Sequence, residues 1–524
     1  MRSIPLAMTW ELLRRGRSWL IVGFVVANAL PMIMFGELRH QRALLPHDKS
    51  FFLISFMMME INMFAFGVAI FAVQGHPSRL FVMPVPTSTI VAWHLFPAMA
   101  LMALESIVST AAANATFGLG WPIWGPAIFL AVMLAAVNAL LWLTEKTVWM
   151  VIGLAPVAAL LGLWFKSRFG PVFSQPTRLW TEVTLGEAAM MLGFAVAAYA
   201  VAVIAVARNR RGDPLPVLGI VAWIDRLFDS SPETRRPFRS PAEAQHWCEW
   251  RRKGWVMPGT VGLVIVGGFI LWLIFNRDLR DLFGGLIAGG GMLSMAGFIG
   301  GVVIGNVGPS DKDYKMGQFL ATRPITNRDL SKTILKTAAK STLIAWGIWV
   351  LAFLLVGAIA GMRIIRQTEI LHHLEAWYFP ATLLGPWIVM AVMISVGLTG
   401  RTRPVLLLGG IVVAWVATMT LPHFVLPRPV EQVFYTGIGA ASGIILIWGN
   451  ARTFIVAWRR SLIGLPTMLV GLFGLLAILA LAALTGVLNP RLPLILNLFF
   501  IGLLSLAVAP LAAVPLALSW NRTR

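Results

Sequence analysis

Residues 246–255 read HWCEWRRKGW and stand directly before a long apolar run. An acidic residue, two basic residues and a glycine recur near the start of the chain at the same spacing, shifted by 238 positions, and again precede an apolar run. The aligned pairs are Glu11 with Glu249, Arg14 with Arg252, Arg15 with Lys253, and Gly16 with Gly254. The recurrence indicates that the same structural element begins two parts of the chain.

A second correspondence follows in the same order. Leu80 and Pro84 fall on Leu320 and Pro324, at a shift of 240 positions. Constant order and near-constant spacing favour two parallel membrane repeats over chance similarity. We therefore predict four regions: a six-helix repeat with its connecting helix, a basic cytoplasmic linker, a second such repeat, and two additional C-terminal helices. Their ranges are 1–207, 208–242, 243–460 and 461–524.

The composition predicts an all-α integral membrane protein. Apolar residues make up 58% of the chain and charged residues 12%, whereas charged residues are about a quarter of a soluble domain. Apolar runs of about 20 residues can cross a bilayer, and they do so as helices because lipid leaves no other partner for the backbone. We predict fourteen spans, within 18–36, 51–73, 88–112, 122–144, 147–165, 186–206, 257–276, 283–306, 341–361, 378–398, 404–420, 434–449, 464–486 and 492–519.

The net charge of +20 is distributed unevenly between the loops. With the N-terminus in the cytoplasm, the inside segments hold 30 Lys and Arg residues and the outside segments hold 12. This is the asymmetry of the positive-inside rule, and an even number of crossings returns the C-terminus to the cytoplasm. We interpret the charge as topology in a plasma or inner membrane, with contacts to anionic lipid and none to nucleic acid.

The N-terminal segment has a second possible interpretation. Basic residues, an apolar core and the small residues around Ala27 resemble a cleavable signal. Cleavage would discard the repeated Glu11 to Gly16 element, so we take this segment as the first transmembrane helix.

Two predicted spans each carry a carboxylate, at Glu60 and Glu105. A carboxylate at membrane depth is costly, so it usually faces a cavity, a partner or a proton path. Simple packing between helices, with hydrogen bonds, is the alternative. The corresponding stretch of the second repeat has no acidic residue, so any site built on these two would be asymmetric.

Two cytoplasmic loops lie at equivalent places in the repeats. The first, residues 74–87, is nearly uncharged, while the second, residues 309–340, is longer and strongly charged. In the second loop Pro324 supplies a turn signal, and Thr326 with Asp329 supplies helix-cap signals. The pattern favours a short helix that a soluble partner could hold, and a solvated basic loop is the alternative.

Motifs for catalysis and nucleotide binding are absent from the sequence. There is no P-loop, no Gly-x-Ser-x-Gly and no His-Glu-x-x-His. His372 and His373 stand near two glutamates on a predicted outer loop, but without the spacing of a tetrahedral metal site. We expect no metal site and no catalytic centre, which disfavours an enzyme acting on lipid.

The layout resembles the membrane subunit of type-2 ATP-binding cassette (ABC) exporters. That family has a connecting helix before the first span and a cytoplasmic coupling loop between spans two and three. Residues 10–17 and 247–255 match the connecting helices. Residues 79–87, here called the first coupling loop, and residues 319–332, here called the second coupling segment, match the coupling loops.

The resemblance implies a permease that exports an unidentified substrate, which could be hydrophobic. A separate ABC ATPase, in two copies, would bind ATP and magnesium, and this chain would bind no cofactor. The residues expected to couple to the ATPase are Arg79, Pro84, Arg323, Pro324, Arg328 and Asp329. The alternative function is a proton-coupled secondary transporter that uses Glu60 and Glu105.

Overall fold

Every regular element in the described parts of this computed structural model is a helix. The described residues are 4–40, 58–59, 61–63, 66–67, 69–70, 80–144, 182–212, 238, 240–275, 279–306, 316, 325–367, 377–401, single positions between 404 and 418, 428–485, 487–488 and 494–522. The helices group by their contacts into two units. Unit 1 comprises Met1–Arg236 with Leu406–Val425, and unit 2 comprises Pro237–Val405 with Leu426–Arg524.

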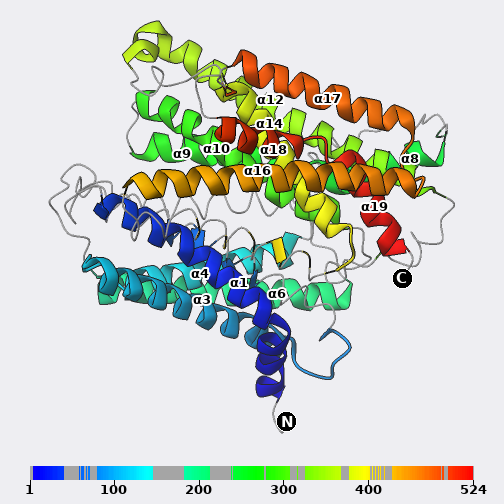
Figure 1. Ribbon diagram of the computed structural model, residues 1–524. Coiled ribbons are helices and arrows are strands. Elements are labelled where there is room, and N and C mark those ends of the chain that lie inside the picture. The colour runs from blue at the N-terminus through cyan, green and yellow to red at the C-terminus, as the bar shows by residue number, and fades with distance from the viewer. Residues whose placement is uncertain are drawn as a thin grey trace. The chain divides into compact units, whose positions relative to one another are not determined.

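Figure 1 shows the helices of both units by label. Unit 1 contains α1 (Ile4–His40), α3 (Thr87–Phe117), α4 (Trp124–Thr144) and α6 (Leu185–Arg211). Unit 2 contains α8 (Pro241–Glu249), the π-helix η2 (Trp250–Gly254), α9 (Val256–Phe275), α10 (Leu279–Gly305), α12 (Asn327–Gln367), α14 (Tyr378–Gly397), α16 (Arg428–Arg459), α17 (Leu465–Leu484), α18 (Leu494–Ser505) and α19 (Pro510–Arg522). The boundary between Arg236 and Pro237 lies inside the predicted linker, while the repeat relationship between the units stays a prediction.

The helices make this a multi-pass membrane protein. Nine helices of the described residues are long and apolar enough to cross a membrane, or ten if the bent pair α18 and α19 is one span. The two helices of that pair meet at 50°, where Pro510 begins α19 without an N–H to continue α18. Predicted spans 51–73, 147–165 and 404–420 lie wholly or largely outside the described residues, so the count of fourteen stays a prediction.

Unit 1 is built on α3, α4 and α6, which lie side by side (Figure 1). One buried cluster joins Leu95 of α3, Ala135 and Trp142 of α4, and Ala202 of α6. Small alanine side chains allow the close backbone approach on which helix packing in lipid depends. This packing fixes the ends of α4 and α6 next to the loop that precedes α3.

Unit 2 is centred on the crossing of α10 and α14. Gly297 and Gly301 of α10 face the backbone of α14: a Cβ built on them would lie 2.6 Å from the carbonyl oxygen of Pro386 and 2.7 Å from that of Met390. Gly305 continues the same face one turn later. Only glycine permits this separation, because a backbone carbonyl cannot rotate away from an added methyl group.

The last helix of the chain belongs to the central core of unit 2. Val514 and Leu518 of α19 are buried in one cluster with Leu330 and Ile334 of α12. The sequence treats residues 461–524 as two helices added after the second repeat. The structure places α19 against α12 and α14, so the last helix of this region is part of the core of unit 2, whereas α17 is mostly exposed.

Candidate functional site

The segment that the sequence predicts as the connecting helix of the second repeat contains a change of helix type. Ser240 caps α8 through its hydroxyl, which accepts from the backbone N–H of Glu243 at 3.2 Å. The chain then forms the π-helix η2, and α9 begins two residues after its last residue, Gly254. Pro258 follows Gly254 by four residues. Since proline has no N–H, the carbonyl of Gly254, the last residue of η2, receives no α-helical hydrogen bond from position 258.

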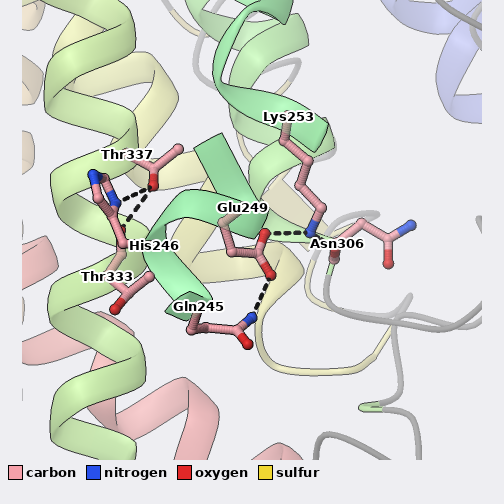
Figure 2. A network of polar contacts seen from close by, with 7 residues as sticks. All are labelled: Gln245, His246, Glu249, Lys253, Asn306, Thr333 and Thr337. Atoms are coloured by element: carbon pink, nitrogen blue, oxygen red, sulfur yellow. Dashed lines mark hydrogen bonds and ion pairs between the residues drawn. The ribbon is translucent and has the colours of Figure 1, made fainter. Parts of the chain in front are cut away.

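A buried ion pair spans η2 (Figure 2). Lys253 Nζ lies 3.1 Å from Glu249 Oε2, and the two side chains are only 9% and 10% exposed. Gln245 Nε2 donates to the other oxygen of Glu249 at 3.0 Å, and Lys253 Nζ donates to the carbonyl oxygen of Asn306 at 2.6 Å. The pair therefore neutralises both charges and joins the connecting helix to the residue that follows α10.

A second set of contacts joins the same element to α12. His246 Nδ1 lies 3.2 Å from Thr337 Oγ1, as Figure 2 shows. Ser341 Oγ donates to the carbonyl oxygen of Gly254 at 2.8 Å, replacing the donor that Pro258 cannot supply. We call these contacts, together with those of Glu249 and Lys253, the connecting joint.

The ring of Trp250 occupies the space beside Gly254. A Cβ on Gly254 would lie 2.3 Å from Trp250 Cε3, and the ammonium group of Lys340 lies 3.9 Å from the ring centroid. Gly254 therefore leaves space for the indole ring of Trp250, and this ring also contacts Lys340 of α12.

The electrostatics of the joint favour a neutral histidine. Partial burial, followed by the nearby charges of Lys336 and Lys340, lowers the pKa of His246 below its usual value. A neutral imidazole ring can exchange a hydrogen bond with the Thr337 hydroxyl group without adding a third positive charge beside two lysines.

The joint contains two of the three predicted residues of this connecting helix. Glu249 and Gly254 lie in it, whereas Arg252 is exposed and lies outside it. Lys253, which forms the ion pair, was not among the predicted site residues. The signal was present in the sequence, because Glu and Lys four residues apart lie on one helix face.

The aligned positions in the predicted first repeat have a different structure. Glu11 is half-buried, Arg14 is exposed and Gly16 is buried, all on α1, which runs as an α-helix from Ile4 to His40. Residue 20, the equivalent of Pro258, is leucine. α1 continues as an α-helix through the residues that align with η2, so the aligned elements have different local structures.

The second coupling segment is described from Ile325 onward, and Arg323 and Pro324 lie outside the described residues. Arg328 is exposed in the first turn of α12. The Asp329 carboxylate accepts from the Thr326 hydroxyl at 2.7 Å, and the Asp329 N–H donates back to that hydroxyl at 3.1 Å. Thr326 therefore caps α12 together with Asp329, as the sequence signals predicted, and Arg328 presents the exposed charge.

The first coupling loop is described from Leu80, so Arg79 lies outside the described residues. Pro84 is exposed, and the neighbouring Val82 is 90% exposed. The guanidinium group of Arg210, at the end of α6, donates to the carbonyl oxygens of Val85 at 2.8 Å and Met83 at 2.7 Å. This bidentate contact, which the sequence did not reveal, holds an apolar tip in a fixed shape.

Glu105 is buried in α3, and Glu60 lies outside the described residues. Glu105 is 3% exposed; its Oε1 accepts from Ser109 Oγ at 2.9 Å and from Asn28 Nδ2 of α1 at 3.1 Å. Oε2 is buried without a hydrogen-bond partner in the described structure. Glu105 is thus packed between helices with one carboxylate oxygen hydrogen-bonded and the other without a hydrogen bond in the described structure.

Comparison with known proteins leaves the site to be interpreted from its own geometry. No protein-family model matches the chain, and no curated protein or solved structure is detectably similar.

Proposed function

We propose that this chain is the permease subunit of an ABC transporter, an exporter whose energy comes from ATP hydrolysed by a separate ATPase subunit in two copies. The observation that carries the proposal is the connecting joint. It bonds the connecting helix to α12, the helix that begins within the second coupling segment. A permease without its own P-loop needs such a connection to convert a partner's movement into movement of its spans.

The joint supplies a physical route for that movement. α12 runs without interruption from Asn327 to Gln367, so a displacement of its first turn moves the whole helix. The contacts of Thr337 and Ser341 transmit the displacement to α8 and η2, and the bond from Lys253 to Asn306 extends it to the end of α10. ATP binding by the partner would shift this equilibrium only if the partner binds one arrangement more tightly than the other.

Affinity purification tests the proposal. The tagged protein, extracted in mild detergent, is expected to bring down a P-loop ATPase in stoichiometric amount, identified by mass spectrometry and by ATPase activity. Replacing residues 319–332 with a Gly/Ser linker should abolish this association. The double variant Arg323→Ala/Arg328→Ala should reduce it by about tenfold or more, because interface arginines commonly contribute more than 1 kcal/mol each.

A matched control separates a specific contact from a general loss of charge. The double variant Arg251→Ala/Arg252→Ala removes two exposed positive charges from the connecting helix and should leave the association unchanged. A protein that purifies alone from well-solubilised membranes, or an association that survives Arg323→Ala/Arg328→Ala, would contradict the assignment.

The environment of Glu105 favours a second candidate, the proton-coupled secondary transporter. A buried carboxyl group with an unpartnered oxygen inside a span is a position where a proton could be taken up and released. This function predicts that cells expressing the chain export an amphiphilic dye such as Hoechst 33342 after ATP depletion, but not after collapse of the proton gradient. Glu105→Gln should abolish that export, since the amide keeps the shape and loses the exchangeable proton.

The permease predicts the opposite results in the same assay. Export should then stop on ATP depletion, and Glu105→Gln should be tolerated, because its amide oxygen can still accept from Ser109 and Asn28.

A further inference from the structure

Asn521, near the end of the chain, bonds two segments that are distant in sequence. Its side chain is 4% exposed. Oδ1 accepts from the backbone N–H of Met316 at 3.0 Å, and Nδ2 donates to the carbonyl oxygen of Leu398, just after α14, at 3.1 Å. The Asn521 amide thus acts both as hydrogen-bond acceptor and as donor to the backbone of other parts of unit 2.

Gly400 lies directly beside the Asn521 amide. Its φ is +69°, a conformation that favours glycine, and a Cβ there would lie 2.3 Å from Asn521 Oδ1. The turn after α14 is therefore shaped around the Asn521 side chain, and a larger residue at position 400 would displace it.

Apolar packing holds α19 against the same place. The side chain of Met316 is buried in one cluster with Leu330 of α12, Leu398, and Ala517 and Leu518 of α19. Met316 lies three residues before the second coupling segment, and Leu330 lies within it. α19 therefore contacts the chain on both sides of Arg323 and Pro324.

The beginning of the C-terminal region lies against the same helix end. A Cβ on Gly464, the residue before α17, would lie 3.7 Å from Arg328 Nη2. Arg328 is the exposed arginine that we assign to the ATPase contact. Gly464 and Asn521 lie near the two ends of region 461–524. Gly464 lies beside Arg328 of the second coupling segment, and Asn521 bonds Met316, three residues before that segment.

We infer that the C-terminal region 461–524 supports Met316 and the described part of the second coupling segment, residues 325–332, and that Asn521 is a positioning residue for ATPase binding. The inference rests on the proposed function, and it gives a role to helices that have no counterpart in the first repeat. Met316 and Leu330 are thus held in place before the partner arrives, which lowers the ordering cost of association.

Amide hydrogen exchange of the full-length protein in lipid nanodiscs tests the support directly. Asn521→Ala removes the acceptor of the Met316 N–H and should accelerate exchange at Met316 by about tenfold or more. Gly400→Ala should also accelerate exchange at Met316, because the added methyl group displaces the Asn521 amide. In this variant the sequence of α19 is unchanged. Ser395→Ala is the matched control and should leave exchange at Met316 unchanged, because within the described residues this hydroxyl bonds only the carbonyl of Ala391 in its own helix.

Affinity purification of the same variants tests the role in ATPase binding. Asn521→Ala and Gly400→Ala should each retain several-fold less ATPase than the wild type, while Ser395→Ala retains the wild-type amount. Unchanged exchange at Met316 in both variants would overturn the support. Accelerated exchange with full ATPase retention would overturn the positioning role. A wild-type protein that retains no ATPase is a different result, because it contradicts the proposed function itself.

Discussion

Replacing Lys253 with methionine is expected to destabilise unit 2 by about 3–5 kcal/mol, because the change leaves the buried carboxylate of Glu249 without its counter-charge. The Lys253 and Glu249 side chains are only 9% and 10% exposed, so water cannot compensate. The bond to the Asn306 carbonyl is lost as well. Denaturant unfolding in mixed micelles measures the effect, with an environment-sensitive fluorophore on Cys248, the single cysteine of the chain, which is exposed on α8.

Two further variants separate the ion pair from the general effect of changing this helix. Arg252→Ala removes an exposed neighbouring charge and should stay within about 0.5 kcal/mol of the wild type. Glu249→Leu/Lys253→Met removes both charges and should recover most of the lost stability, since an apolar pair of similar size costs little in place of a buried ion pair. If the Lys253→Met protein were as stable as Arg252→Ala, the ion pair would contribute little to the stability of unit 2, which would contradict the prediction.

Gly301→Ala and Gly291→Ala are expected to change stability in opposite directions, although both lie inside α10. A Cβ on Gly301 would lie 2.7 Å from the carbonyl oxygen of Met390, so the two helices must separate, at about 1–3 kcal/mol. Among the described residues, no atom outside the local backbone of α10 lies within 4 Å of a Cβ on Gly291. Alanine there should stabilise by about 0.5 kcal/mol through the lower entropy of the unfolded chain.

Thermal unfolding of the two variants, followed by loss of the monodisperse peak in size-exclusion chromatography, checks the signs. A lower melting temperature for Gly301→Ala and an equal or higher one for Gly291→Ala is the expected result. Equal losses in both would mean that α10 tolerates no alanine for reasons unrelated to its crossing with α14.

The two coupling elements are held in different ways. The first coupling loop presents an apolar tip whose carbonyls are bound by Arg210. The second coupling segment presents Arg328 on a capped helix supported by residues 461–524. Under the proposed function, two copies of one ATPase would meet one apolar and one basic contact, so the two contacts should differ in salt dependence.

The sequence alone determined the class of the protein and the places where the helices of the described residues form. Long apolar runs must be helical in lipid, since the backbone has no other partners there. Cap signals at Thr326 and Asp329 correctly predicted the start of α12, because such bonds are local. The repeated element led to Glu249 and Gly254 for the same reason: their spacing is a property of one helix. The pairing of Lys253 with Glu249 could also have been predicted, because the two residues are four positions apart.

The tertiary structure decided which distant groups complete the site. Asn306 and Ser341 lie 53 and 87 positions from the residues they bond, and Met316 lies 205 positions from Asn521. Helix periodicity says which face of a segment is apolar, but hydropathy does not favour one neighbour over another when lipid is as apolar as a helix surface. Glycine contacts, buried amides and a few charge pairs select the neighbours, and these become visible only when the helices are packed.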